Sequence, residues 1–187
     1  MSSASRTIVV VAALLVTASA AQARVWGVGP NLNLGFLSED GGGSVTNLEV
    51  PASLGGLRLT FPMQSPRAAI FLDTGLAFSS TSGAHSDNFS LTGNGQWSLT
   101  PSSAVTPYVT AGLGVLSEGI KAGPSSVSAT SLTVGAGVGI SRKWGDSASV
   151  RGELRYDHIT KGDDGDVRVI DGGNEITFRL GFDLWVK

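Results

Sequence analysis

Two histidines in the sequence stand beside residues with which an imidazole could carry out acid–base chemistry. His85-Ser86-Asp87 joins the three residue types of a hydrolytic site, and Tyr156-Asp157-His158 places the second histidine beside a carboxylate. A serine nucleophile needs a histidine within hydrogen-bond reach and an acid that orients it. Adjacent residues in a polar loop rarely meet that geometry, and His158 is expected on the outer face of a strand near its end. The sequence therefore predicts no catalytic residue and no enzymatic activity.

The run Asp163-Asp164-Gly165-Asp166 could hold a calcium ion through its carboxylate oxygens. If Asp164 is position one of an EF-hand loop, the last aspartate of the run and Glu175 fall at positions three and twelve. Arg168 and Val169 then occupy positions five and six, where the motif needs an oxygen ligand and a glycine. We expect a solvated acidic loop, with weak binding of divalent cations left open. The chain has no cysteine, which excludes thiolate sites and disulfides, and no metal or cofactor is predicted.

Charged residues occupy the polar faces of segments whose other faces are apolar. Four arginines and four carboxylates fall in this set, and equal numbers allow pairing in a low-dielectric interior, where an unpaired charge is costly. We favour a structural plug over a gated ion path. The predicted charge network is Arg58, Asp73, Arg151, Glu153, Arg155, Asp157, Arg179 and Asp183, and the same interior faces carry Asn31, Asn33, Thr92, Asn94 and Gln96.

Segments with a strict period of two position these residues. In the last one, apolar Ile176, Phe178 and Leu180 alternate with polar or small residues, which indicates a strand with two unlike faces. A phase change at Gly55-Gly56 predicts a β-bulge. The expected strands are 25–36, 47–61, 68–78, 88–99, 107–115, 132–143, 150–157 and 175–187. Short turns are expected at 62–66, 101–106 and 144–147, and longer polar loops at 38–46, 79–87, 117–126 and 160–174.

Strands with one apolar and one charged face, joined alternately by short and long connections, are typical of a bacterial outer-membrane barrel. Charged residues make up 15% of the chain, below the roughly 25% of soluble domains. The fold class is therefore all-β: an eight-stranded antiparallel up-and-down transmembrane β-barrel, whose interior is just wide enough for side chains. A soluble lipocalin-like barrel or sandwich is the alternative, but its exposed faces would carry more lysine.

Aromatic residues fall near both ends of the expected strands, as in the girdles that membrane barrels place at the two interfaces. Those expected at the periplasmic end are Trp26, Phe61, Trp97, Tyr108 and Phe182 or Trp185; those at the external end are Phe36, Phe78, Phe89, Tyr156 and Phe178.

The first 23 residues form a separate unit. Arg6 precedes an apolar run over 7–16, and Ala21-Gln22-Ala23 has the small-x-small form of a cleavage site. We expect a cleaved signal peptide at 1–23 and a barrel domain at 24–187, located in the outer membrane of a Gram-negative-type cell envelope. A retained N-terminal anchor is the alternative. A net charge of −2 without a basic run gives no indication of a nucleic-acid partner.

Several segments resemble the small outer-membrane β-barrel superfamily, which includes OmpA-like, OmpX-like and opacity-type proteins of the porin family. They are the signal peptide, 107–114, the glycine-rich strand before Trp144-Gly145, 151–157, and Phe178-Arg179-Leu180-Gly181-Phe182. The resemblance implies insertion by the barrel-assembly machinery, which reads a C-terminal strand ending in an aromatic residue. That strand carries Phe178, Leu180, Phe182, Leu184 and Trp185, although Val186-Lys187 follow the tryptophan.

The sequence indicates a structural or surface-interaction barrel with a filled polar lumen. A small channel is the second hypothesis and a lipid-modifying enzyme the third; the latter agrees poorly with the His-x-Ser pattern of lipid A deacylases, since no residue separates His85 from Ser86. The expected partners are membrane lipid, lipopolysaccharide and an unidentified extracellular ligand at the loops. We expect a monomer.

Overall fold

The computed structural model describes residues 25–40, 44–49, 56–81, 84–101 and 103–186. Most of these residues lie in β-strands. The predicted signal peptide, 1–23, lies outside the described residues. Within the described ranges, no helix is long and apolar enough to cross a membrane.

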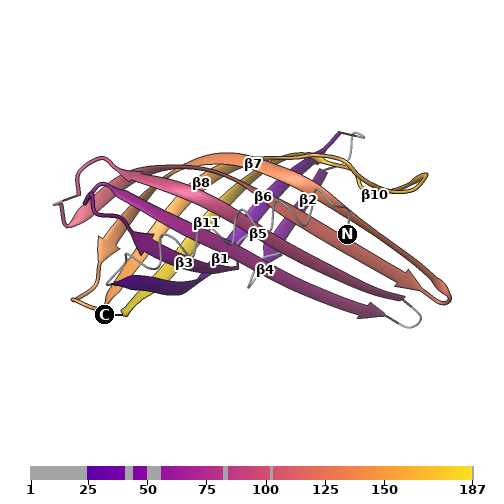
Figure 1. Cartoon of the computed structure of the whole chain (residues 1–187), viewed down its shortest axis with the longest axis horizontal. Coiled ribbons are helices and arrows are strands. Elements are labelled where there is room, and N and C mark those ends of the chain that lie inside the picture. The colour runs from indigo at the N-terminus through magenta and orange to yellow at the C-terminus, as the bar shows by residue number, and fades with distance from the viewer. Residues whose placement is uncertain (1–24, 41–43, 50–55, 82–83, 102, 187) are drawn as a thin grey trace.

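Eight antiparallel strands close into one barrel (Figure 1). β11 pairs with β1 along its whole length and so completes the wall, which gives both terminal strands a hydrogen-bonded neighbour on each side. Lipid offers no partner for a backbone group, so closure is what allows strands to cross a membrane. The predicted fold class is confirmed. The wall strands are β1 (Trp26–Glu39), β3 (Leu57–Pro62), β4 (Ala68–Thr81), β5 (Ala84–Ser98), β6 (Val105–Ala122), β7 (Ser125–Lys143), β8 (Ala148–Ile159) and β11 (Gly173–Val186).

Successive hydrogen-bonded pairs around the barrel are shifted along the strands toward the external end. One circuit from Gly27 on β1 returns to β1 at Leu37, ten residues farther along, and passes through Thr60, Phe71, Asn94, Gly112, Gly135, Asp157 and Glu175. A stagger of this kind requires the strands to tilt, typically by about 35–45° from the barrel axis. With eight strands, the tilted wall leaves an interior that side chains can fill.

Two strands replace the single strand expected over 47–61. β2 (Ser44–Glu49) pairs with the external half of β1, and β3 pairs with its other half. Asn33 pairs with Glu49, and Pro30 pairs with Leu57. Three residues along β1 therefore correspond to eight residues between β2 and β3. This insertion is larger than the single-residue β-bulge that the phase change predicts. Gly55 lies outside the described residues.

Two of the expected polar loops are wrong, because the strands continue through them as hairpins. β4 extends to Thr81 and β5 begins at Ala84, within the expected loop 79–87. β6 and β7 stay paired up to Ala122 and Ser125 across the expected loop 117–126. Gly123, with a φ of 58°, precedes Pro124 in the two-residue turn, the pattern of a type II′ hairpin. Both hairpins project beyond the wall (Figure 1).

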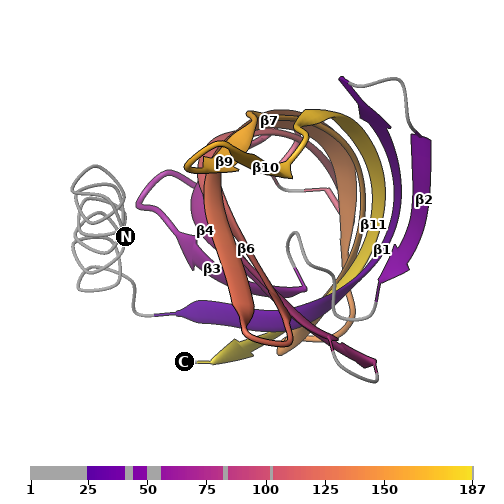
Figure 2. The same ribbon diagram turned by 90° about the vertical axis from the view of Figure 1, so that its right-hand side faces the viewer.

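The acidic segment 160–174 is not a simple loop either. It contains β9 (Gly162–Asp164) and β10 (Val167–Ile170), which form a separate two-stranded sheet. Figure 2 shows this hairpin at the external end of the barrel, beside β7. The Ser128 backbone N–H donates to the Asp164 carboxylate at 2.9 Å, which ties the hairpin to β7. A small apolar cluster lies below it, formed by buried Leu116, Ala129, Ile159 and Ile170, with Leu37 and Val169 packed against them.

The outer face of the wall is apolar. Leu113, Val134, Ile140 and Leu154 are each more than half exposed, and Leu180 is 45% exposed. A water-soluble protein rarely exposes such a contiguous surface, whereas a membrane barrel needs one. The three turns between β3 and β4, β5 and β6, and β7 and β8 lie at the end where Trp26 pairs with Val186. This is the expected periplasmic end.

We predict that the protein is heat-modifiable. In a membrane fraction loaded on a gel without boiling, the folded barrel should resist detergent and migrate apart from the boiled protein, because its two terminal strands, β1 and β11, are hydrogen-bonded to each other. The measurement is migration with and without boiling. A single position, together with recovery in the soluble periplasmic fraction, would contradict the outward-facing apolar wall.

Candidate functional site

The lumen holds the eight charged residues of the predicted network, and their exposed fractions range from 0 to 5%. Alternation along β3, β4, β8 and β11 points each of them inward while their apolar neighbours face outward. The polar residues Asn31, Asn33, Thr92 and Asn94 are also buried, and Gln96 is half-buried. The lumen between these strands is therefore ionic.

Arg58 and Asp73 form the centre of this network. The Arg58 Nε donates to Asp73 Oδ1 at 2.8 Å and its Nη2 to Oδ2 at 3.0 Å, a bidentate pair. The Arg58 Nη1 also donates to Glu153 Oε2 at 3.2 Å. The guanidinium carbon lies 3.7 Å from the ring centroid of Phe71, whose side chain is fully buried. One arginine thus joins β3, β4 and β8 across the lumen.

Arg179 and Arg155 extend the network toward the external end. The Arg179 Nη1 donates to Asp73 Oδ2 at 3.1 Å, and its Nη2 lies 3.5 Å from Asp157 Oδ2. The Arg155 Nε donates to both carboxylate oxygens of Asp157, at 2.9 and 2.8 Å. Together with Arg58 and Glu153, the cluster contains three arginines and three carboxylates, so its formal charges cancel.

A second, smaller cluster lies nearer the short-turn end. Arg151 forms an ion pair with Asp183 and donates a hydrogen bond to the Asn31 side-chain oxygen. Arg151 and Asp183 are 4 and 5% exposed. This cluster is also electrically neutral, as the cost of an unpaired buried charge requires.

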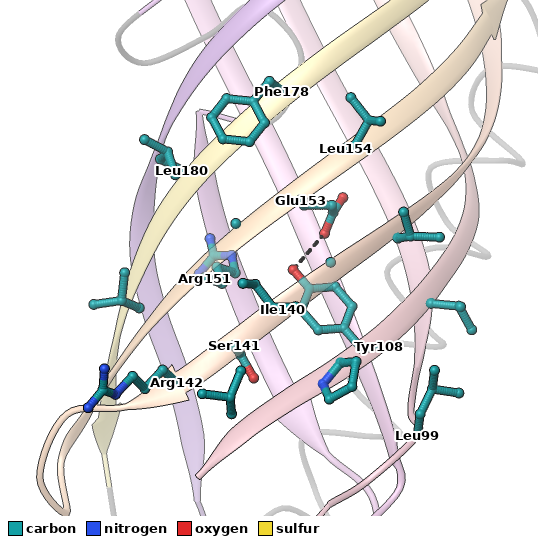
Figure 3. Close-up of a pocket in the computed structure, with 17 residues that line it drawn as sticks. Leu99, Tyr108, Ile140, Ser141, Arg142, Arg151, Glu153, Leu154, Phe178 and Leu180 are labelled. Carbon is teal, nitrogen blue, oxygen red and sulfur yellow. Dashed lines mark hydrogen bonds between the residues drawn. The ribbon is translucent and has the colours of Figure 1, made fainter. Parts of the chain in front are cut away.

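Tyr108 belongs to the lumen and not to the aromatic girdle that the sequence analysis assigned to it. Its side chain is 1% exposed, and its hydroxyl donates to Glu153 Oε2 at 3.2 Å (Figure 3). Phe71, which stacks on Arg58, was likewise missed as a lumen residue. The signal was present in the alternation, since Tyr108 is in phase with Thr110 and Phe71 with Asp73.

Glycines on the inner faces of β6 and β7 provide the space for these side chains. A Cβ at Gly139 would overlap the ring of Tyr108, and one at Gly135 would overlap the carboxylate of Asp157. The sequence predicts that glycines here leave room for long arginines. In the structure, the space beside Gly139 is taken by a tyrosine and that beside Gly135 by an aspartate.

The other aromatic residues of the predicted girdles lie mostly on the outside. Phe61 is buried, Phe182 is half-buried, and the exposed members are Trp26, Phe36, Phe78, Phe89, Trp97, Tyr156 and Phe178. On the C-terminal strand, Leu180 and Leu184 are exposed on the same side as Phe178. Trp185 is half-buried, and its indole Nε1 donates to Ser149 Oγ at 3.2 Å.

The residues that could have done hydrolytic chemistry are not brought together. His85 and Ser86 are consecutive in β5, paired with Ser80 and Ser79 of β4, so their side chains point to opposite faces. The His158 Nδ1 lies 3.0 Å from Asn174 Oδ1, which also accepts from the Tyr156 hydroxyl at 2.6 Å. These contacts place His158 in an exposed polar cluster.

Two carboxylates of the acidic hairpin are engaged by protein groups. Arg168 forms an ion pair with Asp163, and this hydrogen-bonded carboxylate raises the pKa of Arg168. Asp164 accepts from the Ser128 backbone, as described above. Across the described ranges, no three histidine or acidic side chains are grouped so that they could hold a metal ion.

Comparison with known proteins places the chain among membrane barrels. The family model described as "Outer membrane protein beta-barrel domain" matches residues 8–183. Neisserial surface protein A is 18% identical with a TM-score of 0.59, and the match covers 87% of this chain and 96% of that one. Ail, the attachment invasion locus protein of Yersinia pestis, is 13% identical with a TM-score of 0.53, covering 88% and 100%.

A major outer membrane protein from Thermus thermophilus is 16% identical with a TM-score of 0.53, covering 86% of this chain and 99% of its own. No curated protein matches the sequence significantly. At these identities the structural matches show a common fold.

Arg58→Leu should lower the free energy of unfolding by about 3–5 kcal/mol, because buried Glu153 would lose its arginine partner and Asp73 would keep only its contact with Arg179. Arg155→Leu should cost less, since Asp157 keeps Arg179 within 3.5 Å. Urea unfolding of the refolded barrel in lipid vesicles measures both. The matched control is Arg168→Leu, which removes an exposed ion pair and should leave the unfolding curve unchanged. Equal curves for all three variants would contradict the central role of Arg58.

Gly139→Ala should destabilise the barrel, because the new methyl group needs the space occupied by the Tyr108 ring. The same substitution at Gly95 is the control, since a Cβ there would lie 4.0 Å from its nearest neighbour, the Ala111 carbonyl oxygen. The readout is the temperature at which the unboiled gel band is lost. If both variants lose the band at the same temperature, Tyr108 does not depend on the glycine opposite it.

Proposed function

The chain belongs to the family of outer membrane protein beta-barrel domains, and from this premise we propose that it is a non-conducting surface barrel of the outer membrane. Its role is to hold strand hairpins at the cell surface, for envelope structure or for contact with an external partner. We also propose that it is exported through a cleaved signal peptide at 1–23 and inserted as a monomer by the barrel-assembly machinery, with the β11 strand as the recognised end.

The neutral ion-pair network is the observation that carries this proposal. Guanidinium and carboxylate groups from β3, β4, β8 and β11 meet across the lumen at 2.8–3.5 Å, and each is at most 5% exposed. An ion entering this region would have to separate ion pairs whose members are almost fully buried. A lumen filled in this way favours a structural plug over a path for ions.

The external end supports the proposal independently. The β9–β10 hairpin and the apolar cluster of Leu116, Ala129, Ile159 and Ile170 lie between the network and the outside. The aliphatic side chains of this cluster solvate an ion poorly. The β4–β5 and β6–β7 hairpins, in contrast, extend away from the wall (Figure 1), and the β6–β7 hairpin exposes polar residues that include Ser126 and Ser128.

Planar-bilayer recording of the purified protein should show no stepwise conductance, with a general porin in the same bilayer as the positive control. Replacing residues 162–170 by a Gly-Ser linker should leave the recording silent, because the ion-pair network still fills the lumen below. Conductance steps in the wild-type protein would overturn the proposal in favour of a small channel. Steps only in the linker variant would show that the hairpin, and not the network, closes the barrel.

A further inference from the structure

An apolar groove of about 810 Å³ crosses β6, β7, β8 and β11 on the outside of the wall. This volume is within the roughly 300–1,000 Å³ of ligand sites. The apolar side chains that line it from β7, β8 and β11 are 38–57% exposed, while Glu153, which faces the other way from β8, is 2% exposed. The groove therefore opens toward lipid. Its apolar walls include Val138, Ile140, Leu154, Phe178 and Leu180.

Gly152 creates the hollow at the centre of this groove. It lies on the outer face of β8, opposite Ile140 of β7 and Leu180 of β11. A Cβ at Gly152 would lie 3.8 Å from a methyl carbon of Leu180, an ordinary van der Waals contact. The backbone there could thus carry a side chain without strain. The groove is open at its centre because residue 152 has no side chain.

One end of the groove is cationic. Arg142 occupies the outer face of β7 between Val105 and Val150, and Figure 3 shows it at the opposite end from Phe178 and Leu154. A second hollow of about 450 Å³ adjoins the groove, shares Arg142 and Val150 with it, and is lined further by Lys143, Trp144 and Gly145.

The charge of this end has no internal partner. Arg142 and Lys143 form no ion pair within the described part of the chain. Asp146, in the same turn, offsets one of the two positive charges. Trp144 is 72% exposed beside them, and tryptophan is typical of the membrane–water interface.

The dimensions of the groove fit one leaflet. Pairing places Arg142 opposite Val150 and Val150 opposite Phe182, and Phe178 lies four residues farther along β11. Four residues span about 13 Å of strand. Half of the hydrocarbon core of a bilayer is roughly 15 Å. The cationic end lies at the short-turn side of the barrel, which faces the periplasm.

We propose that the groove binds one anionic glycerophospholipid of the periplasmic leaflet. One acyl chain lies over Gly152 between Ile140 and Leu180, and the phosphate is held by Arg142 at the interface. An arginine fork matches phosphate oxygens in two parallel hydrogen bonds.

Native mass spectrometry of the purified barrel, titrated with palmitoyl-oleoyl phosphatidylglycerol or with its phosphatidylcholine counterpart, tests the headgroup contact. The wild type should retain one phosphatidylglycerol with about tenfold higher affinity than phosphatidylcholine, the size expected for a hydrogen-bonded charge pair. Arg142→Gln should remove this preference. Arg67→Gln is the matched control, because Arg67 is an exposed cation in the β3–β4 turn at the same end and does not line the groove. Equal effects of both variants would show nonspecific charge attraction and overturn the proposal.

The groove itself is tested by Gly152→Leu, which fills its centre. Retention of both lipids should fall about tenfold, whereas Gly95→Leu, on another lipid-facing glycine with open space around it, should retain them like the wild type. Unboiled gel migration checks that each variant is folded. Should Gly152→Leu bind like Gly95→Leu, the lipid would be an annular one without a defined site.

Discussion

The bidentate pair between Arg58 and Asp73 is the interaction on which the rest of the lumen depends. Both groups are removed from water, and each carries a cost that only an opposite charge at hydrogen-bond distance offsets. Asp73 also receives Arg179, and Arg58 also reaches Glu153, so the requirement for neutrality spreads from one pair to the whole cluster. Register, tilt and the small inner faces of β6 and β7 can all be understood as conditions for this network to close.

Glycine has two distinct roles in this barrel, set by the face on which it lies. On the inner face, Gly135 and Gly139 accommodate large polar side chains that cross the lumen from neighbouring strands. On the outer face, Gly152 leaves a depression between aliphatic neighbours. The first use brings protein groups together, and the second exposes backbone to the hydrocarbon. Alternate residues of a strand face opposite sides of the wall, so the two roles of glycine can be distinguished from its position in the strand sequence.

Most of the fold and of the charge network could be predicted from the sequence wherever the two faces of a strand meet different surroundings. Arg155 and Leu154 illustrate this, because lipid on one side and an ionic lumen on the other enforce strict alternation. Beyond the membrane both faces of a hairpin meet water, so alternation disappears while the backbone ladder continues. That is why 79–87 and 117–126 resemble loops in sequence although the strands continue through them. Tyr108 has the parity of an inward-facing residue, although an aromatic residue near a strand end is typical of a girdle.

The central network joins parts of the chain that are far apart in sequence. Arg58 meets Glu153 across 95 residues, Arg179 meets Asp73 across 106, and Arg151 meets Asn31 across 120. Contacts between residues so far apart in sequence form late in folding, because closing the long loop between them costs conformational entropy. Arg58 and Asp73 are 15 residues apart and can pair within one hairpin, whereas their contacts with Glu153 and Arg179 can form only once β8 and β11 are in place. A barrel closed in the wrong register would leave these buried charges uncompensated, so the network favours the native register over shifted ones.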